Sequence, residues 1–205
     1  MQIKKEDLRT KLLDAAEKEF YMKGFEKASI RAIVKAAGTT TGNYYNYFES
    51  KEALFEALVL ESDQAFHVMM DHEEAIDRPD DLWHTPDVHA WREQLKPFFK
   101  TLLPVFNRRF YLLIARSEGT KYAGRREVFN RFFAEHFIDH MARFNPDYPY
   151  APMGTILAKQ LVDGILNIIE SADTIDAYED IVIEFILFIA IGTMGILQRK
   201  ELSHD

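Results

Sequence analysis

The apolar positions of this chain recur with the period of α-helices almost throughout. Leu8, Leu12, Ala16 and Phe20 stand four apart, which places them on one face of a predicted helix from about residue 7 to residue 23. The same period predicts further helices at about residues 50–72, 87–103, 104–117, 125–144, 153–171 and 176–200. No stretch shows a convincing strand pattern. With two shorter helices before residue 50, the prediction is an all-α chain of about nine helices.

The stretch from residue 29 to residue 51 predicts two short helices joined by a tight turn. Ser29 has the short hydroxyl side chain that favours a helix start, and apolar residues follow it at helical spacing. Gly38 is expected to end this helix, because a residue without a Cβ enters the left-handed region at little cost. Thr40 can cap a second helix only two residues later. So short a connection makes the helices cross steeply, which is the helix-turn-helix arrangement.

The second of these helices, at about residues 40–47, has an outer face that suits nucleic acid. Its outer positions are small or hydrogen-bonding, whereas Tyr44 and Phe48 supply the apolar side that packs inward. No acidic residue lies between Gly38 and Phe48. A surface that approaches phosphates should lack carboxylates and present hydroxyl, amide and backbone N–H groups. The alternative is a small helical hairpin with a polar outer side.

The run from Leu12 to Leu58 resembles the DNA-binding head of the TetR/AcrR family of one-component transcriptional regulators. The matching residues are Ala15, Ala16, Phe20, Gly24, Ile33, Ala37, Gly38, Gly42, Tyr45, Tyr47, Phe48, Ser50, Lys51, Glu52 and Leu54. This pattern covers about a quarter of the chain. The remainder resembles the family only in size and helical character. Val34, Thr39 and Tyr44 depart from the usual Ala, Val and Leu, at positions expected to face inward.

The resemblance implies a homodimeric, sequence-specific transcriptional repressor that a small hydrophobic ligand releases from a near-palindromic operator in double-stranded DNA. It implies a DNA-binding domain at residues 1–50 and a helical ligand-binding and dimerisation domain at residues 51–205. The DNA-binding candidates are Thr41, Asn43 and Asn46 for base edges, Ser29, Arg31, Thr40, Tyr45 and Lys51 for phosphates, and Gly42 on the same surface. A regulator controlled by a protein partner is one rival, an activator another, and an all-α enzyme the least supported class.

The charge of the chain is unevenly distributed. The net charge is −8, yet residues 1–51 hold ten Lys or Arg against seven Asp or Glu, a local charge of +3. A mildly basic head on an acidic body suits DNA that is approached by one end of the protein. Residues 108–131 form a second basic stretch with a charge of +5. Such a stretch is usually a solvated face, and the alternative is a site for an anionic ligand.

Other functional classes have little support. There is no cysteine, which excludes disulfides and thiolate zinc sites and suits a cytoplasmic protein. No nucleophile elbow, phosphate loop or zinc-protease motif is found. His136 and His140 stand at a metal-ligand spacing, but without an evident third ligand neither a metal nor another cofactor is expected. The apolar run 181–197 is expected to be a buried helix and not a membrane anchor.

Large apolar side chains are dense in the predicted body. The family resemblance implies a ligand cavity in this body, and Pro97 and Pro104, which are expected to disturb helix packing, are consistent with it. The candidate lining residues are Phe66, Met70, Trp91, Phe98, Phe110, Phe133, Phe137 and Met141.

The helix expected at residues 176–200 is apolar nearly all round, which the core of one subunit alone does not explain. This helix and the one before it are therefore expected to pair with their symmetry mates in a four-helix dimer interface. The candidate interface residues are Ile156, Gln160, Asp163, Gly164, Asn167, Phe188, Gly192 and Gly195.

Overall fold

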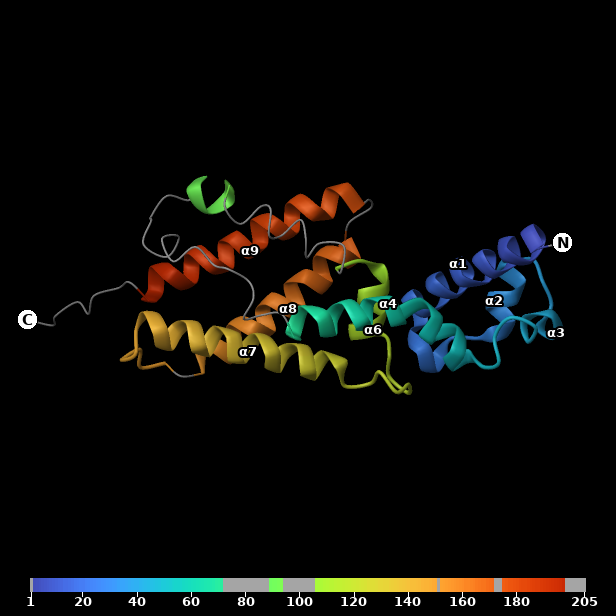
Figure 1. The fold of residues 1–205 in the computed structure, drawn as a ribbon, viewed down its shortest axis with the longest axis horizontal. Coiled ribbons are helices and arrows are strands. Elements are labelled where there is room, and N and C mark those ends of the chain that lie inside the picture. The colour runs from blue at the N-terminus through green and yellow to red at the C-terminus, as the bar shows by residue number, and fades with distance from the viewer. Residues whose placement is uncertain (1, 72–88, 94–105, 151, 172–174, 198–205) are drawn as a thin grey trace, which may run out of the picture. The chain divides into compact units, whose positions relative to one another are not determined.

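A computed structural model of the chain describes residues 2–71, 89–93, 106–150, 152–171 and 175–197 (Figure 1). The helices with full bounds are α1 (Gln2–Lys27), α2 (Ile30–Ala36), α3 (Thr41–Tyr44), α4 (Lys51–Asp71), α6 (Arg108–Ala115), α7 (Arg125–Phe144), α8 (Met153–Ser171) and α9 (Ile175–Leu197). Residues 89–93 add a short helical stretch. Over these ranges the structure contains helices and no strand, so the all-α prediction is confirmed.

Local signals set most of the helix ends. At Gly24 the backbone has φ 73°, which interrupts the helical run of α1 before its last residues. Gly38 has φ 69° in the turn after α2. The hydroxyl groups of Thr40 and Ser50 each accept a hydrogen bond from the backbone N–H three residues on, at 3.2 and 3.0 Å. The predicted caps of α3 and α4 are therefore confirmed.

The start of α6 was predicted wrongly. The helix begins at Arg108 and not at Pro104, which lies outside the described residues. The cause is Asn107, whose side-chain oxygen accepts hydrogen bonds from the backbone N–H groups of Arg109 and Phe110 at 2.8 and 3.1 Å. Two bonds from one cap satisfy the first free donors of the helix and fix its start.

The chain divides into two compact units. The first contains Met1–Met69 and Val105–Arg126, and the second contains Met70–Pro104 and Glu127–Asp205. The first unit therefore includes α6 in addition to the helices of the predicted DNA-binding head. The first unit also includes residues 51–69 of α4, so the compact units differ from the expected functional domains, whose boundary after residue 50 stays a prediction.

Aromatic packing holds the first unit together. The ring centroids of Phe20 and Phe55 lie 5.1 Å apart, and those of Phe25 and Phe55 lie 5.4 Å apart, both edge to face. Tyr111 brings α6 against α1, with its ring centroid 4.9 Å from that of Tyr21. Edge-to-face pairs of this kind stabilise a core beyond the area they bury. Helix α1 therefore has a core on both sides, one shared with α4 and one with α6.

The basic stretch at residues 108–131 contributes to the first unit rather than forming only a solvated face. Arg125 pairs with Asp63 of α4, with two N–O distances of 2.7 and 3.3 Å. Lys121 pairs with Glu56, which lies about two helical turns before Asp63 on α4. The Arg116 Nε donates to the backbone oxygen of Tyr21 on α1 at 3.0 Å. Arg125 and Arg116 therefore bind groups of the first unit instead of facing solvent freely, whereas Lys121 pairs with Glu56 at an exposed position. The anionic-ligand alternative stays a prediction.

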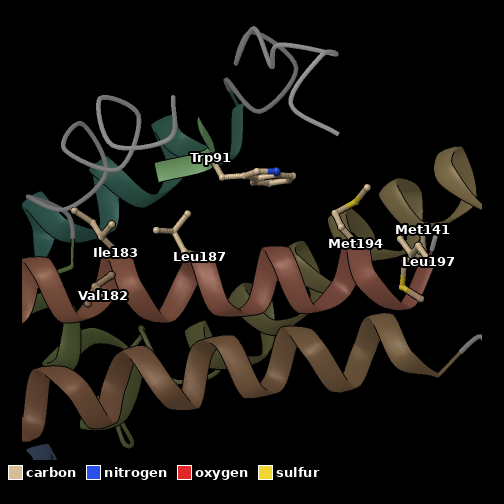
Figure 2. Packing of buried hydrophobic residues seen from close by; sticks show 7 residues of the cluster. All are labelled: Trp91, Met141, Val182, Ile183, Leu187, Met194 and Leu197. Atoms are coloured by element: carbon tan, nitrogen blue, oxygen red, sulfur yellow. The ribbon is translucent and has the colours of Figure 1, made fainter. Parts of the chain in front are cut away.

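In the second unit, α8 and α9 pack side by side (Figure 1). The buried apolar cluster of this unit comprises Trp91, Met141, Val182, Ile183, Leu187, Met194 and Leu197 (Figure 2). Trp91 lies over the side of α9 that carries Leu187 and Met194. Gly164 lets the two helices approach, because a Cβ there would lie 2.2 Å from the ring of Phe185.

One face of α9 stays uncovered. The window Asp180–Leu197 is long and apolar enough to cross a membrane by length and composition, a test that core helices of soluble proteins also pass. Only 33% of this window is buried within one copy of the chain, so burial of the rest of the helix against a partner stays a prediction. Ile181, Phe188 and Ile196 are exposed at helical spacing, Phe188 with 72% of its surface.

Candidate nucleic-acid interface

The connection between α2 and α3 is held by backbone hydrogen bonds. The N–H of Thr39 donates to the carbonyl of Val34 at 2.9 Å, which folds the chain back over the end of α2. Helix α3 has four residues, Thr41–Tyr44, so it is shorter than the expected span 40–47. The reason is that Asn46 and Tyr47 donate to carbonyls three residues back, which tightens the last turn.

The inward side of this second helix is as predicted. Tyr44 and Phe48 are both buried, and their ring centroids lie 5.9 Å apart. The hydroxyl of Tyr44 donates to the backbone oxygen of Ser50 at 2.7 Å. Burial raises the pKa of Tyr44 to about 12, with a smaller contribution from neighbouring Tyr45. Tyr44, a departure from the family pattern, therefore satisfies its polar atom inside the first unit and anchors the start of α4.

The outward side presents the predicted polar side chains. Thr41, Gly42 and Asn46 are exposed, and Tyr45 has 54% of its surface exposed. Asn43 is half-buried.

A chain of hydrogen bonds orders the two asparagines on this side. The side-chain amide of Asn43 donates to the hydroxyl of Thr39 at 2.9 Å, and the amide of Asn46 donates to the side-chain oxygen of Asn43 at 3.2 Å. Thr39 was not predicted as part of the site. Its place three residues before Gly42, where the family usually has Val, was the signal available in the sequence.

Two of the predicted phosphate contacts lie at the start of α2, with Ser29 just before the helix and Arg31 in its first turn. Ser29 and Arg31 are both exposed. The Ser29 side chain makes no capping hydrogen bond, so its predicted role as a helix cap is wrong. Instead, the backbone N–H of Ser29 donates to the carboxylate of Glu19 at 3.2 Å. Glu19 was missed because its partner lies ten residues away, although a carboxylate on the apolar face of α1 was visible in the sequence.

Lys51 has partners other than the predicted phosphate. Its Nζ donates to the backbone oxygens of Phe25, Glu26 and Ala28 at 2.8, 3.2 and 3.2 Å. It also lies 4.4 Å from the centre of the Phe25 ring. An ammonium group has three donors, and these contacts use all three. The prediction that Lys51 contacts DNA phosphate therefore conflicts with the hydrogen bonds that its ammonium makes.

The predicted ligand-lining residues fall in both units. Phe66 and Phe110 are buried in the first unit, whereas Met70, Trp91, Phe133, Phe137 and Met141 belong to the second, and Phe98 lies outside the described residues. Trp91 and Met141 are part of the packed cluster of the second unit. Phe133 and Phe137 are half-buried on α7.

The predicted dimer residues are mostly open. Ile156, Gln160, Asn167, Phe188, Gly192 and Gly195 are exposed, and Asp163 is half-buried. A Cβ added at Gly192 or Gly195 would meet no atom within 4 Å. Gly164 differs, because its open side is filled by Phe185 of the same chain. Its predicted role at a dimer interface is therefore replaced by packing within one subunit.

His136 and His140 form a pair on α7 with the spacing of metal ligands. The ring centroids of His136 and His140 lie 4.4 Å apart, and His140 is buried. Among the described residues no group of three metal-binding side chains comes together.

Comparison with known proteins gives matches to the first unit. Residues 12–58 match the model of bacterial regulatory proteins of the tetR family. The chain is 46% identical over 59 residues to YdgC of Bacillus subtilis, an uncharacterized HTH-type transcriptional regulator, covering 29% of this chain and 30% of that one. It is 39% identical over 64 residues to the HTH-type transcriptional regulator UidR of Escherichia coli K12, covering 31% and 33%.

These relatives are named as regulators and not as enzymes, in agreement with the prediction. The chain spans about a third of the length of these two curated relatives. Among solved structures, a TetR family transcriptional regulator from Chloroflexus aurantiacus aligns with 95% of this chain and 93% of its own. The TM-score is 0.53 at 17% identity, which supports a common fold.

Proposed function

We propose that the chain, whose residues 12–58 match the model of the tetR family of bacterial regulatory proteins, is a DNA-binding transcriptional repressor of that family. The observation that carries the proposal is the outward side of the helix-turn-helix. Thr41, Tyr45 and Asn46 are exposed there, and no carboxylate lies between Gly38 and Phe48. Such a surface can enter the major groove, where amides and hydroxyls read base edges.

The roles on this surface follow from reach and chemistry. Thr41, Asn43 and Asn46 are proposed to contact base edges, with the Thr39–Asn43–Asn46 hydrogen bonds holding the two amides in place. Ser29, Arg31, Thr40 and Tyr45 are proposed to contact phosphates, because hydroxyl and guanidinium donors position a protein on DNA without reading sequence. Gly42 leaves room for the close approach, since its Cβ position is open.

The experiment is footprinting on the DNA upstream of the gene that encodes this chain and of its neighbours. A protected near-palindromic segment, lost when Asn46→Ala and Thr41→Ala are combined, supports the proposal. Protection by the double variant equal to that of the wild type assigns DNA binding to another surface. No protection at any promoter tested contradicts the repressor function.

We also propose that a small apolar effector binds the second unit and releases the DNA. The half-buried aromatic side chains of α7, Phe133 and Phe137, support this part of the proposal. Phe137→Ala should weaken the effector-induced loss of the footprint and leave operator affinity unchanged without effector. A footprint that responds to a protein from the same cell, and to no small molecule, favours control by a protein partner instead.

We propose that the DNA-bound form is a homodimer assembled through α8 and α9. The support is the exposed apolar side of α9 around Phe188 and the open glycines Gly192 and Gly195. Two such helices can approach closely at the glycines, which have no side chain. Two DNA-binding heads related by two-fold symmetry match a near-palindromic operator.

A further inference from the structure

Residues 24–29, called here the α1–α2 turn, comprise the last residues of α1 and the link to α2, and the Ala28 N–H donates within them to the carbonyls of Gly24 and Phe25 at 3.1 and 3.3 Å. This turn begins at Gly24 with φ 73° and ends at Ser29, whose side chain makes no capping hydrogen bond with α2. The helices it must orient are short, since α2 has seven residues and α3 has four. Helices of this length are not stable alone, so their direction depends on what holds their ends.

A cation from α4 binds the carbonyl side of this turn. The Lys51 ammonium donates to the oxygens of Phe25, Glu26 and Ala28, which are separated from it by 23 to 26 residues in sequence. The ring of Phe25, at 4.4 Å, covers the same ammonium. The three carbonyls converge on one point, a geometry that a compact ammonium fits and a planar guanidinium does not.

An anion from α1 binds the amide side of the same turn. One oxygen of the buried Glu19 carboxylate accepts from the Ser29 N–H at 3.2 Å and from the Lys23 Nζ at 2.8 Å. Ser29 is the residue before α2, so this bond fixes the first free donor of that helix. The lowered pKa of Glu19 keeps the carboxylate charged at neutral pH.

We propose that Lys51 and Glu19 are positioning residues of the DNA-binding head, which clamp the α1–α2 turn from both sides and thereby set the direction of α2 and α3. Lys51 acts through the turn and not through a phosphate. This inference rests on the proposed function, because a clamp on the turn matters for operator binding only if α3 meets DNA.

The first experiment measures the clamp without DNA, by amide hydrogen exchange in the intact chain. Glu19→Ala should raise the exchange rate of the Ser29 amide by roughly tenfold or more, and Lys51→Met should do so at Ala28 and Ser29. The exposed residues Asp14 and Lys18 of α1 supply matched controls, Asp14→Ala and Lys18→Met, which should leave these rates unchanged. Equal exchange in the clamp variants and the wild type overturns the proposal.

The second experiment uses operator and scrambled duplexes at several salt concentrations. Lys51→Met should weaken operator binding by tenfold or more, with the slope of log affinity against log salt unchanged. Lys51→Arg should behave like Lys51→Met, because it keeps the charge and loses the geometry.

A phosphate contact gives the opposite pattern. The slope then falls by about one, both duplexes weaken alike, and Lys51→Arg retains full affinity. That pattern overturns the inference. A wild-type protein that binds no duplex contradicts the proposed function instead, and the exchange measurement still decides on the clamp.

Discussion

At the scale of single residues, the side chains proposed to contact bases on the outward side of α3 are linked by hydrogen bonds. Asn46 is exposed but is tied to Asn43, which is in turn tied to Thr39. An amide with one hydrogen bond to a neighbour loses less freedom on binding, and its remaining groups are directed outward. The residues proposed to contact bases therefore depend on one another. The changes in binding free energy caused by their single substitutions should not add up.

Thr41→Ala and Asn46→Ala should each cost roughly 1–3 kcal/mol of operator binding free energy, because each removes a base-edge contact. Binding to a scrambled duplex should change little. Asn43→Ala should cost at least as much as Asn46→Ala, since it also releases the Asn46 amide. Titrations on both duplexes measure this. Thr41→Ser, which keeps the hydroxyl, is the matched control, and equal losses on both duplexes would contradict the assignment.

Glu19 makes a prediction about pH. Burial alone would raise the pKa of its carboxyl, but hydrogen bonds from Lys23 and the Ser29 N–H, with the Lys23 charge, lower it below the ordinary value of 4.5. A lowered folded-state pKa means that the charged form stabilises the fold above the unfolded-state pKa. This stabilisation is lost as the pH falls through the folded-state value.

Glu19→Gln should therefore lower the urea midpoint at about pH 7, and this loss should shrink as the pH falls through the folded-state pKa of Glu19, below which the wild-type carboxyl is neutral too. Comparing the two proteins at each pH cancels the other titrating groups. A difference that persists unchanged at the acid pH would show that the carboxylate charge is not what stabilises the turn.

At the scale of helices, some local signals were sufficient, although the expected cap at Ser29 and the expected start of α6 were wrong. The capping residues Thr40 and Ser50 and the turn at Gly38 could be read from side-chain type alone. The partners of Lys51 and Arg125 could not be predicted from side-chain type, because they lie 23 or more residues away in sequence. A run of cations has the same composition whether it faces solvent or pairs with the acids of another helix.

Two ion pairs join the segment after α6 to α4, and they should differ in strength. Asp63 is buried and receives two bonds from Arg125, whereas Lys121 and its partner Glu56 are more exposed. Arg125→Met should destabilise the first unit by about 1–3 kcal/mol, because it leaves a buried carboxylate without its cation.

The matched control for this pair is Lys121→Met, which should cost at most about 1 kcal/mol, as exposed pairs do. Urea denaturation of the two variants measures the difference. If both variants lose the same stability, burial does not distinguish these two pairs.

At the scale of the whole molecule, the exposed apolar side of α9 is a feature that the described part of one copy does not explain. Phe188 at 72% exposure, with the exposed Ile181 and Ile196 about two turns away on either side, would meet water in a monomer. The sequence predicted this side as an interface because α9 is apolar nearly all round. It could not predict that Gly164 makes room for the ring of Phe185 in the same subunit, because this contact forms only when α8 and α9 pack together.

Phe188→Glu should convert the proposed dimer to a monomer at micromolar concentration, because two carboxylates would face each other across an apolar contact. Light scattering measures the mass directly, and operator affinity should fall with it, since one head alone meets half of the site. Met22→Glu is the matched control: Met22 is 68% exposed, but on α1, so this change should leave the mass unaltered. A wild-type protein that is already monomeric, or a Phe188→Glu variant that stays dimeric, would place the interface elsewhere.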